Sequence, residues 1–61
     1  MNKTKVLVAD DHKLVREGIV KLLGFYEELE VIGEAKDGLE TVEKIRNEFP
    51  DLVLLDLNMP R

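Results

Sequence analysis

Two short apolar runs that both end in aspartate constrain the fold of this chain more than any other feature. Residues 6–9 lead directly into Asp10 and Asp11, and residues 52–55 lead directly into Asp56. Consecutive apolar residues without polar alternation indicate strands covered on both faces, as in a parallel sheet. We therefore expect two buried strands, over 5–10 and 51–57, whose carboxyl ends carry acidic side chains.

The segment after the first strand has apolar residues at helical spacing, which predicts a helix over residues 12–25 that ends near Gly24. The apolar face is expected to comprise Leu14, Val15, Gly18, Ile19, Leu22 and Leu23, and the solvent face Lys13, Arg16, Glu17 and Lys21.

A second strand and a second helix are predicted before the last strand. Residues 30–35 read as a strand that is less buried than the first and weakened by Gly33. Asp37 and Glu40 have the spacing of a capping box at the start of a helix, and Pro50 stops that helix. Its apolar stripe is predicted to comprise Leu39, Val42, Ile45 and Phe49.

This alternation of strands and helices predicts an α/β fold, β-α-β-α-β, with parallel strands joined by right-handed crossovers. If the two crossovers lie on opposite faces, the strand order is 2-1-3, and the carboxyl ends of the first and third strands form a switch point where ligands bind. Asp10, Asp11 and Asp56 would meet there. Neighbouring carboxylates repel one another, and a divalent cation relieves the repulsion. A carboxylate beside such a cation can also attack phosphorus.

Composition bounds the function further. The chain has 61 residues, a formal net charge of −4 at pH 7 and no cysteine. The charge argues against direct binding of nucleic acid by these residues, and the missing cysteines fit a reducing, cytoplasmic setting. Its apolar runs are too short for a membrane span of roughly 18 residues or for a secretory signal with about 7–15 apolar residues.

The apolar side chains of the last strand cannot all be buried, because this strand is the most apolar of the three and two helices cannot shield it. An exposed apolar edge favours association with another chain. We therefore expect residues 1–61 to be the N-terminal half of a larger domain, truncated before a fourth strand. The isolated half is expected to self-associate through the third strand.

The motifs resemble a known family, the receiver domain of two-component response regulators, which has a flavodoxin-like fold. The resemblance rests on the Asp10-Asp11 pair, on Asp56 and on the sequence 58–60, Asn-Met-Pro. The stretches 6–12, 14–18, 31–35 and 37–38 are most similar to the transcription-regulator subfamily with a C-terminal LuxR-type helix-turn-helix.

The resemblance implies that Asp56 is the phosphoacceptor for a sensor histidine kinase. It implies that Mg²⁺ is held by Asp11, by Asp56 and by the backbone carbonyl of Asn58, with Asp10 acting through a water. Asp10, Asp11 and Asp56 would be the catalytic set of a signalling domain that is not a conventional enzyme. The family's later Thr or Ser, Lys and switch aromatic, and the DNA-binding output domain, have no counterpart in these residues.

Other interpretations of the same residues stay open at this stage. Asp11 taken alone could cap the first helix, and His12 is expected to be a surface histidine rather than a metal ligand. The alternative function is an aspartyl phosphotransferase or phosphatase of the haloacid-dehalogenase type. That family wants a second Asp two residues after the nucleophile, where this chain has Asn58, and it gives the Asp10-Asp11 pair no role.

Overall fold

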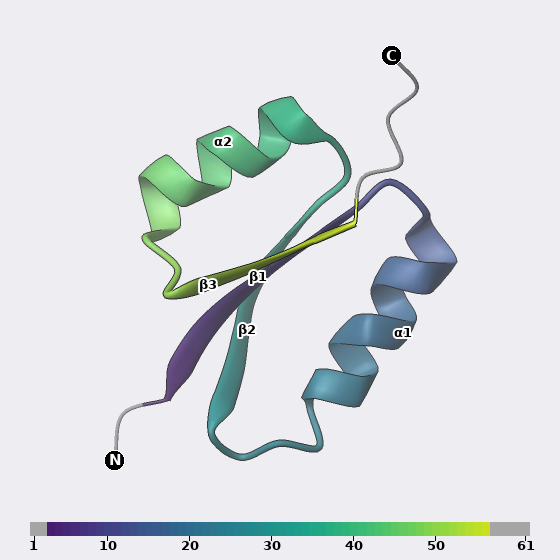
Figure 1. Ribbon diagram of the computed structural model, residues 1–61, viewed down its shortest axis with the longest axis vertical. Coiled ribbons are helices and arrows are strands. Elements are labelled where there is room, and N and C mark those ends of the chain that lie inside the picture. Colours follow the sequence, from purple (N-terminus) through teal and green to yellow (C-terminus); the bar gives the residue numbers. More distant parts are fainter. Residues whose placement is uncertain (1–2, 57–61) are drawn as a thin grey trace.

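The computed structural model describes residues 3–56, in which strands and helices alternate along the chain (Figure 1). The elements are β1 (Thr4–Asp10), α1 (Lys13–Leu23), β2 (Leu29–Ala35), α2 (Gly38–Glu48) and β3 (Leu52–Asp56). All five predicted elements are therefore present, with boundaries shifted by one or two residues.

The three strands form one parallel sheet in the order β2-β1-β3, and the two helices lie on opposite sides of it (Figure 1). This arrangement confirms the predicted α/β fold and its 2-1-3 strand order. The pairing of β1 with β2 is interrupted after Val6, which pairs with Val31, because Leu7 then pairs with Gly33. Ile32 is the extra residue of this irregularity, so the weak point of the predicted strand lies next to its glycine.

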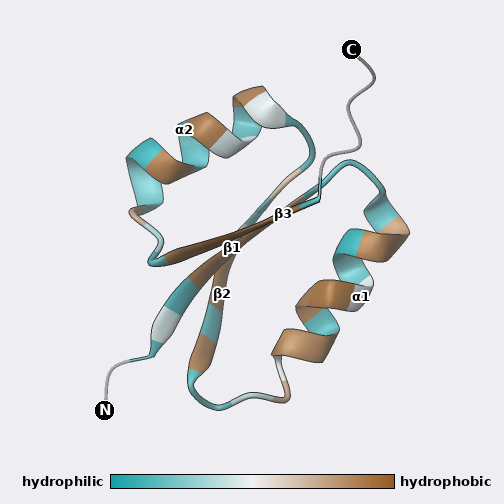
Figure 2. Ribbon diagram, viewed as in Figure 1, coloured by the Kyte–Doolittle hydropathy of each residue, from teal (hydrophilic) through white to brown (hydrophobic). Residues whose placement is uncertain are grey.

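The core is centred on β1, where the side chains of residues 6–9 are at most 1% exposed. The predicted cover on both faces is thus confirmed for this strand, and so is the expectation that two helices cannot shield β3. Leu52 is 44% exposed and Leu55 is 63% exposed, since β3 lies beside β1 and neither helix packs on it. Figure 2 shows the hydrophobic colouring of β1 and β3 together with apolar segments on both helices.

The orientation of α1 differs from the prediction. Its partly buried residues are Arg16, Ile19, Val20 and Leu23, whereas Leu14, Val15 and Leu22 are exposed. Arg16 therefore belongs to the sheet-facing side and not to the solvent face. The apolar arc of this helix is wider than the surface that three strands offer, so the pattern alone places its centre wrongly.

The start and end of α2 follow from local bonds. The Asp37 side chain accepts a hydrogen bond from the Glu40 backbone N–H at 2.8 Å, as the capping box predicts. The Glu40 carboxylate in turn accepts from the N–H of Lys36, one residue before the cap. The helix ends at Phe49, which adopts the left-handed conformation, φ 53°, directly before Pro50.

The predicted apolar stripe of α2 is largely exposed, and Thr41 is the buried residue of this helix instead. The Thr41 hydroxyl donates to the backbone carbonyl of Asp37 at 2.7 Å, so its burial leaves no unpaired donor. Among residues 3–56, no helix is long and apolar enough to cross a membrane.

Candidate functional site

The register of β1 and β3 brings two of the predicted acids to one place. Asp10 pairs with Asp56 as the last pair of the two parallel strands. Side chains of paired residues in neighbouring parallel strands point to the same face of the sheet, so both carboxylates lie on one face at its carboxyl edge. Asp10 is 1% exposed, whereas Asp56 is exposed at the end of the edge strand.

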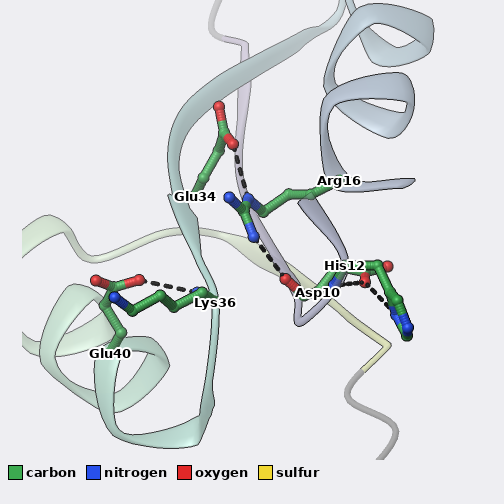
Figure 3. Close-up of polar contacts among 6 residues, drawn as sticks. All are labelled: Asp10, His12, Arg16, Glu34, Lys36 and Glu40. Carbon is green, nitrogen blue, oxygen red and sulfur yellow. Dashed lines mark hydrogen bonds and ion pairs between the residues drawn. The ribbon is translucent and has the colours of Figure 1, made fainter. Parts of the chain in front are cut away.

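Asp10 is held at two of its three oxygen atoms. Its Oδ1 accepts a hydrogen bond from the backbone N–H of His12 at 2.8 Å, and its carbonyl accepts from Nη1 of Arg16 at 2.8 Å (Figure 3). Its Oδ2 is buried and has no hydrogen-bond partner among residues 3–56. A buried carboxylate oxygen without a partner is costly. A water or a cation bound at this edge would satisfy it, so the site fits the donor set expected for Mg²⁺.

Asp11 and His12 complete a compact group with Asp10. His12 Nδ1 lies 2.9 Å from Asp11 Oδ1 and 3.7 Å from Asp10 Oδ1. Potential ligand atoms of these three residues all lie within 4.8 Å of one another. The strand register places Asp56 beside Asp10, but Asp56 is not one of the three side chains of this group.

The helix-cap interpretation of Asp11 is not supported, because His12 occupies the N-cap position of α1 and Asp11 contacts its ring instead. The His12 side chain is 64% exposed, as predicted for a surface histidine, although it also contacts the acids. Asn58, the predicted carbonyl ligand, lies outside the described residues.

Arg16 is a site residue that the sequence interpretation missed. Its Nε donates to Glu34 Oε1 at 2.9 Å while Nη1 donates to the Asp10 carbonyl, and its side chain is only 15% exposed. Glu34 pairs with Val8 of β1, which puts it on the same face of the sheet as Asp10. An acid inside a predicted strand was the available signal, since such a residue on a helix-covered face needs a cationic partner.

Comparison with known proteins gives a consistent family assignment. The family model described as the response regulator receiver domain matches residues 6–61. The transcriptional regulatory protein DegU of Brevibacillus brevis is 40% identical over 60 residues, which are 98% of this chain and 25% of DegU. The chain thus spans about a quarter of the length of this relative.

Two solved structures share the fold. The signal receiver domain of the response regulator NarL from Mycobacterium tuberculosis superposes with a TM-score of 0.90 at 45% identity, covering 98% of this chain and 48% of that one. RcsB from Salmonella enterica serovar Typhimurium superposes with a TM-score of 0.88 at 34% identity, covering 97% of this chain and 29% of RcsB.

These matches confirm the predicted resemblance, including its similarity to transcription regulators, and they give no support to the haloacid-dehalogenase alternative. The Asp10-Asp11 pair at the end of β1 is also a feature to which that alternative gives no role. The chain belongs to the response regulator receiver domain family.

Proposed function

We propose that this chain is the phosphoacceptor part of a two-component response regulator and that Asp56 accepts the phosphoryl group. The observation that carries the proposal is the pairing of Asp10 with Asp56 at the carboxyl edge, where Oδ2 of Asp10 is buried without a partner among the described residues. The exposure of Asp56 suits a nucleophile that must meet a phosphoryl group presented by another protein.

In the proposed reaction, a carboxylate oxygen of Asp56 forms a bond to phosphorus as the P–N bond of a kinase phosphohistidine breaks. The imidazole leaves with the bonding electron pair and takes a proton from solvent. Asp11, Asp56 and the backbone carbonyl of Asn58 would hold Mg²⁺, and Asp10 would act through a water. When bound, Mg²⁺ supplies positive charge that offsets the charge on the transferring phosphoryl oxygens.

The wider role is proposed from the relatives. DegU is a transcriptional regulatory protein, and RcsB has been solved on promoter DNA in the presence of the phosphomimetic BeF₃⁻. We propose that phosphorylation of this cytoplasmic receiver by a sensor histidine kinase controls a DNA-binding output domain in the complete regulator. The receiver is then a signalling domain that promotes its own phosphorylation and dephosphorylation, rather than an enzyme with a separate substrate.

The proposal is tested by incubating the 61-residue chain with a small acyl phosphate and Mg²⁺ and then measuring its intact mass. We expect one phosphoryl adduct with Mg²⁺ and none with excess EDTA, because without the cation the acids repel the incoming phosphoryl group. Circular dichroism under both conditions shows whether the chain is folded. A folded chain that gains no adduct in Mg²⁺ would contradict the proposal for these residues.

We also propose that the chain self-associates through β3. Within the described part of the chain, the outer edge of this strand has no pairing strand, and Leu52 and Leu55 on its two faces are exposed. An unprotected apolar edge is a template for strand pairing. A two-fold axis normal to the sheet would join two copies of β3 antiparallel and continue the sheet from one copy to the other.

A lysine on this edge strand should disfavour the association, because charged side chains on an edge block strand pairing. We therefore expect Leu55→Lys to shift the mass measured by light scattering toward the monomer across a wide concentration range. Leu14→Lys is the matched control, since Leu14 is 81% exposed on α1, away from the edge. A monomeric parent chain that is well folded would rule the association out.

A further inference from the structure

We infer that Arg16 is a positioning residue for the acidic site, holding the end of β1 so that the Asp10 carboxylate faces the proposed cation. The inference rests on the proposed function, because it concerns how the same acids are arranged. Arg16 contacts no substrate in this assignment and acts through Asp10.

The guanidinium of Arg16 joins three elements at the carboxyl edge. Arg16 lies in α1, its Nε donates to Glu34 of β2, and its Nη1 donates to the backbone carbonyl of Asp10 at the end of β1 (Figure 3). The planar fork of an arginine can donate in two fixed directions at once, and a lysine ammonium cannot reproduce this geometry. The Arg16 side chain is only 15% exposed and its bond to the Asp10 carbonyl is partly buried, which limits competition by water there, whereas the Glu34 side chain is 43% exposed.

The consequence for Asp10 is that its backbone and its side chain are both fixed. The Arg16 bond holds the carbonyl, and the His12 N–H holds Oδ1. Of the three Asp10 oxygens, Oδ2 is buried and has no partner in the part of the chain that the structure describes. Residues that orient a metal ligand without contacting the metal commonly have a large effect on the affinity of the site for the metal.

Glu34 explains why the positively charged guanidinium of Arg16 can lie close to the proposed Mg²⁺ site. Its carboxylate lies 2.9 Å from Arg16 Nε and offsets the guanidinium charge locally. The two possible roles of Arg16 therefore predict opposite results. If Arg16 acted only through its charge, its removal would tighten Mg²⁺ binding, whereas loss of a positioning contact would weaken it.

The test uses Arg16→Lys and Arg16→Gln in the 61-residue chain, with Mg²⁺ affinity measured by NMR titration of the Asp10 and Asp11 amides. We expect both variants to bind Mg²⁺ about tenfold more weakly, the lower end of the range for residues that orient metal ligands. Arg46→Gln is the matched control, because it removes the same charge from an exposed position on α2 and should leave the affinity unchanged. Arg16→Lys keeps the charge and most of the packing stem, so it is the variant expected to stay folded.

A second readout separates positioning from a general loss of stability. In metal-free protein, exchange of the His12 amide hydrogen should accelerate in the Arg16 variants, while exchange of the Val8 amide in the core of β1 should not. Affinity that is unchanged or tighter in Arg16→Lys would overturn the inference, and so would equal acceleration at both amides. If the parent chain itself binds no Mg²⁺, the proposed function fails first, and that result is distinct from a failure of Arg16 alone.

Discussion

Replacing Asp56 with asparagine is expected to abolish phosphorylation of this chain and leave its fold intact. Asparagine has nearly the same shape, but its amide cannot act as the nucleophile that a carboxylate provides. Asp56 is exposed at the end of β3, so the substitution should change the free energy of unfolding by less than about 0.5 kcal/mol. Intact mass after treatment with Mg²⁺ and an acyl phosphate measures the first effect, and urea unfolding measures the second.

Asp51→Asn provides a control at the opposite end of the same strand. Asp51 precedes β3, and its Oδ2 accepts a hydrogen bond from the Lys5 backbone N–H at 2.9 Å, far from the carboxyl edge. This variant should gain the phosphoryl adduct like the parent. If the Asp56→Asn chain still gained an adduct, another residue would be the acceptor and the proposed role of Asp56 would have to be abandoned.

The topology could be predicted from the sequence because a small number of physical constraints is enough to determine it. A fully apolar run such as residues 6–9 is typical of a strand that is covered on both faces. Alternation with helices then forces parallel strands, and crossovers on opposite faces put β1 in the centre. The pairing of Asp10 with Asp56 follows from that order, although the two residues lie 46 positions apart in the sequence and nothing local to either one indicates it.

The orientation of the helices could not be predicted in the same way. Helical periodicity finds the widest apolar arc, and for α1 this arc extends past the surface that three strands can cover. The buried side of α1 is decided partly by Glu34, a residue in another element that pairs with Arg16. A polar residue that is buried because of a distant partner leaves no periodic signal in its own helix.

Asp10→Asn is expected to stabilise the metal-free chain and to weaken its binding of Mg²⁺. The Asp10 carboxylate is buried, and its Oδ2 is unpaired within residues 3–56. Such a charged group destabilises the folded state more than a neutral amide of the same shape. Asparagine keeps the oxygen that accepts from the His12 N–H. We expect a gain of roughly 1–2 kcal/mol in EDTA, with Mg²⁺ affinity lowered by roughly 10- to 100-fold.

Urea unfolding with and without Mg²⁺ checks both effects in one experiment. A ligand that binds only the folded state stabilises it in proportion to the logarithm of its concentration over its dissociation constant. The parent should therefore gain stability from Mg²⁺ and approach the variant, which should gain little. An Asp10→Asn chain that is less stable than the parent in EDTA would show that the carboxylate is satisfied without a cation. A variant that is more stable than the parent in EDTA would mean that position 10 holds an acid although a neutral residue there gives a more stable fold. Binding of a cation by that acid is the physical reason for its presence.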